Sequence, residues 1–308
     1  MDDTIGENLR RAAGRFAERG IDTAALDAEV LLAHTLSVDR IELHLQKDRV
    51  LTGDESARFE DYVARRSKRE PVAYITGYKE FWSVNICVTP DVLIPRPETE
   101  GIVEQALSVI ASAAKQSQGH NGIATALSGP RNDTLDILDL CTGSGCVAAA
   151  LATELPDAAI TVADISPAAI EVAKKNLAFA GNRVNYFIGD LFDGLHDSRF
   201  TIHDSRKYDL ITANPPYVSD GDFDTLEDDI RLYEPQSALT AGADGLAISK
   251  RIIQDAPKYL KPGGTLIMEM GLGQAQALWD FAVDTGKCES IKVFEDYSGI
   301  ERILWISF

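Results

Sequence analysis

Cysteine and positive charge are both scarce in this sequence. The 308 residues include four cysteines, which are too few to staple a chain of this length and lack the spacing of a Cys-X-X-Cys pair. We therefore expect reduced thiols. Lysine and arginine number 30 against 48 aspartates and glutamates, which gives a formal charge of −18 at pH 7. Because an acidic protein repels a phosphate backbone, we expect no direct nucleic-acid substrate.

Long apolar runs are absent as well. No segment is long enough to span a bilayer, and the N-terminal stretch places Asp2, Asp3 and Glu7 among arginines, where a secretion signal needs an apolar core. We therefore expect a cytoplasmic protein that has no membrane partner. Separately, we expect a monomer. None of the five histidines lies in the motifs described below, and we expect no metal.

The apolar content of 45% is enough for the cores of two domains, the number that a length of 308 residues suggests. Apolar residues recur with helical spacing through most of residues 1–72, and Pro71 ends the pattern. β-Prone residues such as Tyr74 and Ile75 follow. The sequence therefore predicts a helical domain over residues 1–72 and a linking β-hairpin over residues 73–92.

Short apolar runs separated by helical patterns make up the rest of the chain. They lie at residues 135–140, 160–164, 184–188, 210–213 and 265–270. Strands that alternate with helices predict an α/β domain with a parallel, doubly wound sheet over residues 93–308. Residues 111–134 and 196–206 lack apolar periodicity, and we expect surface loops there, the first of them flexible. The second repeats the tetrapeptide His-Asp-Ser-Arg, which is weak evidence for a function on a polar loop.

A glycine-rich turn follows the first of these strands, in the sequence Asp139-Leu-Cys-Thr-Gly-Ser-Gly145. Glycines let backbone N–H groups approach a ligand closely at the start of a helix, and no Gly-Lys-Ser/Thr follows, so this is not a phosphate loop. Asp164 ends the next strand, where a carboxylate can accept hydrogen bonds from ribose hydroxyls. The alternative is that Asp164 only caps the next helix, although Ser166 is the better cap. The pair predicts a nucleoside-containing cofactor.

The motif Asn214-Pro-Pro-Tyr217 ends the fourth apolar run. Two prolines stiffen the backbone and leave its carbonyls free to accept hydrogen bonds, while the Asn214 side chain adds another acceptor and Tyr217 can stack on a planar group. This combination favours binding of a planar NH₂ group at the carboxyl edge of the sheet. A purely structural turn is the alternative.

Together these motifs resemble the class I S-adenosylmethionine-dependent methyltransferases that modify amide or exocyclic amino nitrogens. Five further blocks are similar to the HemK/PrmC family, which methylates N5 of the glutamine in the Gly-Gly-Gln motif of class 1 peptide chain release factors. They are residues 71–77, Phe81-Trp82, residues 93–100, Tyr233-Glu-Pro235 and residues 242–246. The resemblance implies a Rossmann-like methyltransferase domain behind a small helical domain that recognises the release factor, with S-adenosylhomocysteine as the second product.

The substrate amide is expected to donate hydrogen bonds to the Asn214 side chain and the Pro215 carbonyl, with Pro216 and Tyr217 completing its site. The residues expected to bind the cofactor are Arg96, Glu98, Asp139, Cys141, Thr142, Gly143, Ser144, Gly145, Asp164, Leu191 and Asn214. The family usually has glycine at the place of Cys141, so we expect its side chain to point away from the cofactor or the loop to shift. Leu191 takes the place of an aromatic residue that packs on adenine in some relatives.

Other functions use a similar set of motifs. A ribosomal-protein glutamine methyltransferase shares the fold and the Asn-Pro-Pro-Tyr motif, and adenine or cytosine amino-group DNA methyltransferases use an Asn-Pro-Pro-aromatic motif on a flipped base. The charge of −18 argues against DNA, and the block around Tyr233 is more similar to the release-factor branch. A dinucleotide-dependent dehydrogenase or a non-catalytic adaptor is compatible with the glycine-rich turn but not with Asn214-Pro-Pro-Tyr217.

Overall fold

The structure, a computed structural model, describes residues 3–117, 134–196 and 207–308. Two compact units make up the chain. The first consists of Met1–Tyr78 and Leu226–Glu234, and the second of Lys79–Thr225 and Pro235–Phe308. Within the described ranges, no helix combines the length and the apolar character needed to cross a bilayer.

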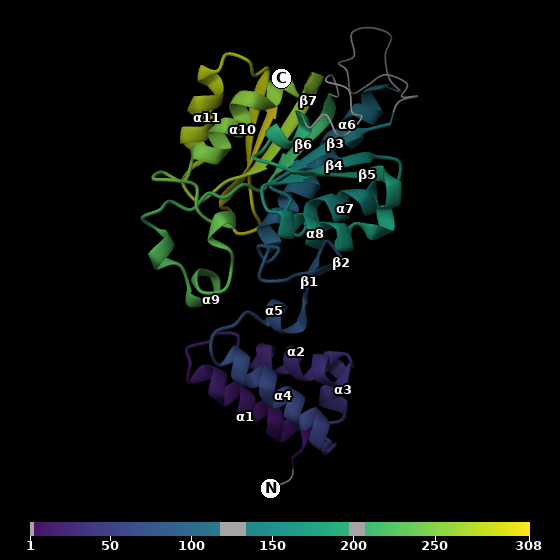
Figure 1. The fold of residues 1–308 in the computed structure, drawn as a ribbon, viewed down its shortest axis with the longest axis vertical. Coiled ribbons are helices and arrows are strands. Elements are labelled where there is room, and N and C mark those ends of the chain that lie inside the picture. Colours follow the sequence, from purple (N-terminus) through teal and green to yellow (C-terminus); the bar gives the residue numbers. More distant parts are fainter. Residues whose placement is uncertain (1–2, 118–133, 197–206) are drawn as a thin grey trace. The chain divides into compact units, whose positions relative to one another are not determined.

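The first unit is helical (Figure 1). Its N-terminal part contains α1 (Ile5–Ala17), α2 (Ala24–Leu36), α3 (Arg40–Leu45) and α4 (Gly53–Arg66). Helix α4 begins with a capping box, because Thr52 Oγ1 accepts a hydrogen bond from the backbone N–H of Glu55 while the Thr52 N–H donates to the Glu55 carboxylate. The buried side chains of these helices, among them Phe16, Leu31, Leu43 and Phe59, form one core.

A segment from far along the sequence completes this unit. Helix α9 (Asp228–Arg231) lies in Leu226–Glu234 and carries Asp229, whose Oδ2 accepts a hydrogen bond of 2.6 Å from the buried guanidinium of Arg66. Arg69 forms an ion pair of 2.5 Å with the other oxygen of Asp229. A buried guanidinium needs such partners because it has lost its hydration. The side chains at the end of α4 therefore tie this remote segment to the helical unit.

Residues 72–76 are helical, and the prediction that Tyr74 and Ile75 belong to a hairpin was wrong. They lie in α5 (Val72–Thr76), which follows Pro71 and ends at Gly77, whose φ of 81° is left-handed. The two residues are buried, and a single helical turn buries them without a partner strand. The hairpin itself consists of β1 (Tyr78–Phe81) and β2 (Val84–Cys87), joined by two residues with positive φ, as in a type I′ turn.

The second unit contains a seven-stranded sheet with the order β5-β4-β3-β6-β7-β9-β8. Its strands are β3 (Asp136–Leu140), β4 (Ala159–Asp164), β5 (Val184–Ile188), β6 (Tyr208–Ala213), β7 (Leu260–Glu269), β8 (Ser290–Glu295) and β9 (Glu301–Ser307). The strands β3 to β7 are parallel, whereas β9 runs antiparallel to both β7 and β8. The prediction of a parallel, doubly wound arrangement is confirmed for the five strands that the sequence indicated. Strands β8 and β9 were not predicted, and the short connection between them allows their antiparallel pairing.

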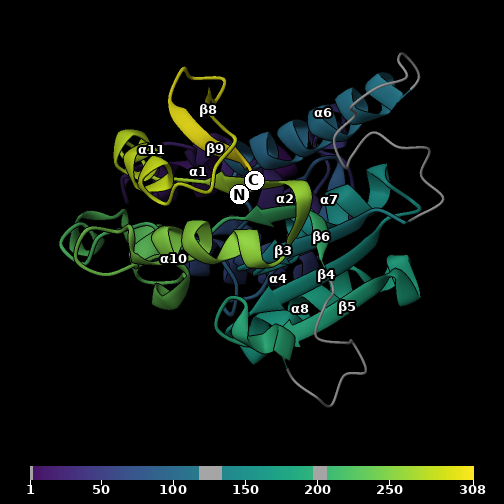
Figure 2. The same ribbon diagram turned by 90° about the horizontal axis from the view of Figure 1, so that it is seen from above.

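Two groups of helices cover this sheet (Figure 1 and Figure 2). One comprises α6 (Glu100–Ser117), α7 (Cys146–Glu154) and α8 (Pro167–Asn176), and the other α10 (Ala247–Asp255) and α11 (Ala275–Asp284). Short 3₁₀ turns are η1 (Pro97–Thr99), η2 (Ala178–Arg183), η3 (Asp193–His196), η4 (Phe223–Thr225), η5 (Gln236–Ala238) and η6 (Ala256–Lys258). Strand β3 lies between β4, the next strand in the sequence, and β6. The strand order therefore reverses at β3, and open α/β sheets bind ligands at such a point of reversal.

The sequence predicted loops at residues 111–134 and 196–206, and the structure describes only a part of each. Helix α6 extends to Ser117, so the expectation of a loop was wrong for residues 111–117, where alanine and other good helix formers continue the helix. Residues 118–133 and the greater part of residues 196–206 lie outside the described residues. The repeated His-Asp-Ser-Arg tetrapeptide falls there except for His196.

Candidate active site

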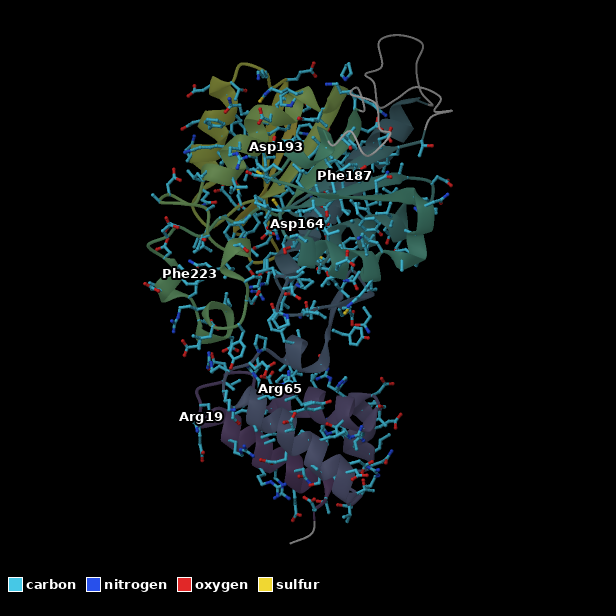
Figure 3. All side chains as sticks on the ribbon, viewed as in Figure 1. Arg19, Arg65, Asp164, Phe187, Asp193 and Phe223 are labelled. Atoms are coloured by element: carbon cyan, nitrogen blue, oxygen red, sulfur yellow. The ribbon has the colours of Figure 1, made fainter. Side chains whose placement is uncertain are left out.

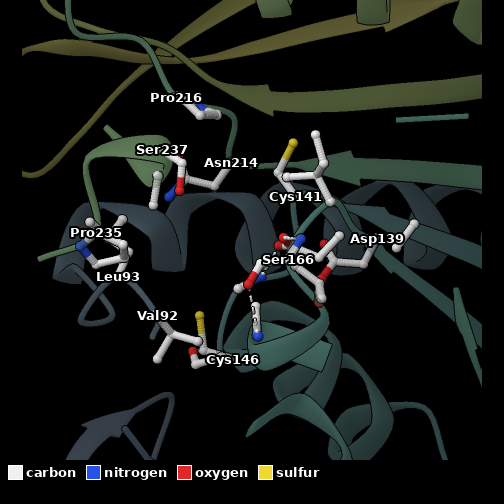
Figure 4. A pocket seen from close by; sticks show the side chains of 18 of the residues that line it. Val92, Leu93, Asp139, Cys141, Cys146, Ser166, Asn214, Pro216, Pro235 and Ser237 are labelled. Carbon is white, nitrogen blue, oxygen red and sulfur yellow. Dashed lines mark hydrogen bonds between the residues drawn. The ribbon is translucent and has the colours of Figure 1, made fainter. Parts of the chain in front are cut away.

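A cavity of about 310 Å³ opens at the carboxyl ends of β3, β4 and β6. This size is within the range of small-molecule sites. In the close-up, Asn214, Pro235 and Ser237 group at one end of the cavity, whereas Asp139 and Ser166 lie at the other (Figure 4). The cavity therefore joins the turn after β6 to the glycine-rich turn after β3.

The glycine-rich turn uses left-handed backbone conformations. The φ angles are 53° at Cys141, 53° at Gly143 and 77° at Gly145. A Cβ at Gly145 would lie 3.1 Å from the Cβ of Ala173, so this glycine allows α7 to pack closely on α8. Gly145 is not among the residues that line the cavity. Cys141 has a conformation that favours glycine. The residue lines the cavity, and its half-buried side chain packs on the core. Burial raises the pKa of its thiol well above its usual range.

Asp164, labelled in Figure 3, is the last residue of β4 and ties this strand to the glycine-rich turn. Its Oδ2 accepts a hydrogen bond of 2.8 Å from the Gly143 N–H, and its Oδ1 accepts one of 2.9 Å from the Ser166 N–H. The helix cap of α8 is Ser166, whose Oγ accepts from the Ala169 N–H. Burial raises the pKa of Asp164, and the backbone hydrogen bonds oppose that shift. Since an ionised carboxylate accepts about four hydrogen bonds, Asp164 retains capacity for a ligand.

Asp139 lies below the turn, buried at the end of β3. It accepts hydrogen bonds from the hydroxyls of Thr142, at 2.6 Å, and Thr212, at 2.7 Å. Burial raises the pKa of Asp139 to about 6, against the effect of the two hydroxyls, and the nearby Asp164 carboxylate adds to the increase. A cation in the cavity would favour the ionised form of this carboxyl.

Asn214 belongs to a chain of hydrogen bonds that starts at the end of β7. Its Nδ2 donates to Thr99 Oγ1 at 3.0 Å, and the Thr99 hydroxyl donates to Glu269 Oε2 at 2.6 Å. The Tyr217 hydroxyl donates to the other Glu269 oxygen at 3.2 Å. The buried Glu269 therefore connects to both ends of the Asn214-Pro-Pro-Tyr217 motif. Sequence reasoning missed Glu269 and Thr99, although Thr99 lies within the family-like block at residues 93–100.

Most of the residues expected at the site line the cavity. They are Arg96, Asp139, Cys141, Thr142, Gly143, Ser144, Asp164, Leu191, Asn214 and Pro216. The exposed Glu98, the buried Pro215, and Gly145 and Tyr217 are not among its lining residues. A lining residue that the sequence did not single out is Ile165, an apolar side chain that is 62% exposed beside Asp164. The sequence feature that could have indicated Ile165 is its position directly after Asp164, the carboxylate that ends β4.

Across residues 3–117, 134–196 and 207–308, no group of three or more His, Cys, Asp or Glu side chains is arranged to hold a metal ion. That a metal is not needed stays a prediction.

Two family models match the sequence. The model described as the PrmC N-terminal domain matches residues 7–77, and the methyltransferase small domain matches residues 107–230. Among curated relatives, a protein of Geobacter sulfurreducens named release factor glutamine methyltransferase is 40% identical over 98% of this chain and 95% of its own length. Proteins of the same name from Rhodopirellula baltica and Vibrio cholerae are each 37% identical over 98% of this chain, and the match covers 95% and 96% of them, respectively.

Solved structures resemble the fold. The catalytic domain of hMettl16, in complex with an RNA hairpin of the MAT2A 3′UTR, matches with a TM-score of 0.51 and 15% sequence identity, over 79% of this chain and 81% of that one. At this identity the likeness concerns the methyltransferase fold alone.

Proposed function

Because this chain belongs to the family of release factor glutamine methyltransferases, we propose that its cavity is where a methyl group passes from S-adenosylmethionine to the glutamine side chain of a release factor. One observation carries the proposal. A single cavity has Asp164 and the glycine-rich turn at the end suited to a nucleoside and Asn214 at the end suited to an amide.

The residues of the cavity fit the cofactor. Asp164 has capacity to accept hydrogen bonds from ribose hydroxyls, and Ile165 and Leu191 offer apolar surface to the adenine. Asp139 supplies negative charge near the methionine end, which carries an ammonium and a sulfonium, and Arg96 lines the same cavity. When bound, S-adenosylmethionine supplies an electrophilic methyl group.

The substrate side works chiefly by positioning. The lone pair of a carboxamide nitrogen is delocalised into the carbonyl, so an ordinary side-chain base cannot activate it by deprotonation, and holding the nitrogen in line with the methyl group becomes the main task. Asn214 Oδ1 and the Pro215 carbonyl each accept a hydrogen bond from the glutamine NH₂. Pro216 lines the cavity, and we propose that Tyr217, which is not among the lining residues, packs on the amide plane.

Atoms and charge balance without a dedicated base. Transfer forms the N–C bond as the S–C bond breaks, and the leaving group is the neutral thioether S-adenosylhomocysteine. N-Methylation makes the amide nitrogen acidic, so it then loses one proton to water. None of the five histidines of the sequence lies in the site motifs, and none is needed.

The helical domain at residues 1–72 is proposed to select the release factor by contacts outside the Gly-Gly-Gln loop. A short loop offers little surface, so discrimination among cellular glutamines needs binding energy remote from the reacting amide. The acidic total charge permits this contact, because a protein partner can present a basic face. We propose that the protein acts as a monomer in the cytoplasm.

A direct competition tests the function. The protein is incubated with S-adenosylmethionine labelled in its methyl group and with intact class 1 release factor, ribosomal protein and DNA side by side. We expect label in the Gly-Gly-Gln glutamine of the release factor, located by mass spectrometry. Label in the ribosomal protein or DNA, with none in the release factor, would support the corresponding alternative and contradict the proposal.

A further inference from the structure

The Asn214 side chain has two ends of nearly the same shape and opposite chemistry. Only its Oδ1 can accept a hydrogen bond from a substrate NH₂ group, whereas Nδ2 would bring a donor against a donor. Rotation of the amide by half a turn exchanges the two ends. The site therefore needs a device that decides which end faces the cavity.

We propose that Glu269 and Thr99 are positioning residues that fix the orientation of the Asn214 amide. The inference rests on the proposed function, in which Asn214 accepts from the substrate. Burial raises the pKa of Glu269, and the hydroxyls of Thr99 and Tyr217 and the charge of Arg302 oppose that shift. In its ionised form the Glu269 carboxylate can only accept hydrogen bonds, so the one proton of the Thr99 hydroxyl goes to Glu269, across 2.6 Å. Thr99 is left with lone pairs alone and can only accept from Asn214. This gives the observed contact from Nδ2 at 3.0 Å and leaves Oδ1 for the substrate.

Burial makes this arrangement decisive. Glu269 and Thr99 are each 1% exposed, so water does not compete for their hydrogen bonds. The second Glu269 oxygen accepts from the Tyr217 hydroxyl at 3.2 Å. The carboxylate at the end of β7 therefore sets the first residue of the motif through Thr99 and holds the last residue directly.

Thr99 can be altered with few other changes. Thr99→Val keeps the shape and removes the hydroxyl, and Thr99→Ser keeps the hydroxyl. We expect Thr99→Val to lower kcat on intact release factor about 10- to 100-fold while the Kd of S-adenosylmethionine stays within a few-fold, and Thr99→Ser to retain most of the wild-type kcat. Thr161→Val is the matched control, because Thr161 is also a buried threonine, lies in β4, and is not part of the chain of hydrogen bonds.

Glu269→Gln tests the direction of the chain. The new amide can donate to Thr99, which frees the Thr99 proton for Asn214 Oδ1 and allows the reversed orientation. We expect a loss of kcat similar to that of Thr99→Val, with the protein folded and the cofactor bound normally. If Thr99→Val does not fold, comparison of Thr99→Ser with Thr99→Ala tests the same role of the hydroxyl, because these two variants differ only by that group.

The outcomes separate this inference from the function it rests on. Loss of activity in Asn214→Ala, together with wild-type kcat in folded Thr99→Val or Thr99→Ala and in Glu269→Gln, would overturn the positioning role and leave Asn214 as the acceptor. Wild-type activity in Asn214→Ala would instead overturn the proposed role of Asn214.

Discussion

The backbone N–H of Gly143 donates a hydrogen bond of 2.8 Å to Oδ2 of Asp164, so the carboxylate that ends β4 holds the turn that follows β3. One side chain therefore shapes the cavity and offers its remaining lone pairs to whatever binds there. Altering Asp164 therefore changes both the glycine-rich turn and the ligand site.

Asp164→Ala is expected to weaken S-adenosylmethionine binding by roughly 1–3 kcal/mol, because it removes an acceptor for the ribose and the support of the glycine-rich turn. Isothermal titration calorimetry measures the affinity. Asp164→Asn is the control, because it keeps an oxygen for one hydrogen bond and should bind with intermediate affinity. Wild-type affinity in the alanine variant would limit Asp164 to a structural role.

Asn214→Ala is expected to lower turnover by orders of magnitude and to change the affinity for S-adenosylmethionine by no more than a few-fold. The reason is that its oxygen acts on the substrate amide. Steady-state kinetics with intact release factor and a separate cofactor titration give the two values. A weakened cofactor affinity with unchanged turnover would reverse the assignment.

Cofactor affinity is expected to rise as the pH passes through about 6 and to level off about one pH unit higher. Burial raises the pKa of Asp139 to about 6, so below that pH the free protein carries a neutral carboxyl that must lose its proton before it can face a cationic ligand. Binding at pH 5.5 should be about fourfold weaker than on the plateau. Burial also raises the pKa of Asp164 and Glu269, so Asp139→Asn provides the control. If the pH dependence persists in that variant, Asp139 is not its source.

Cys141→Gly is expected to be more stable than Cys141→Ala by about 1 kcal/mol. At a φ of 53° an L-residue pays a steric cost that glycine avoids, and both variants lose the same thiol. Urea unfolding of the two variants measures the difference. Equal stability would mean that the turn adjusts to a Cβ at this position without strain.

Asp229→Ala is expected to destabilise the helical unit by about 2 kcal/mol, because the buried Arg66 loses a charged partner at 2.6 Å. Asp228→Ala is the matched control one residue away. The ion pair of Asp228 with Arg231 is exposed and should contribute less than about 1 kcal/mol. Thermal unfolding of both variants checks the contrast, and similar losses would show that burial of Arg66 is not the cause.

The sequence was most informative where the residues of a single helix or strand are sufficient to determine its structure. The apolar run at residues 184–188 coincides with β5, and Ser166 caps α8 as its residue type suggests. Strand β8 was not predicted, because none of its side chains is fully buried and it therefore lacks the apolar run that is typical of the central strands. The polar composition after residue 110 also hid the end of α6, since alanine and lysine favour a helix without an apolar stripe.

The candidate site also contains residues that local sequence indicates and residues that it does not. Asp164 and Asn214 lie in contiguous motifs, and their chemistry can be inferred from a few neighbouring letters. The hydrogen bond between Thr99 and Glu269 joins residues 170 positions apart, and nothing local to either residue indicates the other. Such a contact follows only from the tertiary fold, in which α6, the helix that begins directly after Thr99, packs on β7.

The membership of Leu226–Glu234 in the helical unit has a consequence for synthesis on the ribosome. The chain passes between the two units three times, after Tyr78, after Thr225 and after Glu234. Asp229 therefore reaches Arg66 and Arg69 only when most of the polypeptide has been translated. Until then Arg66 can pair with Asp27 but not with Asp229, so this unit is completed only late in translation.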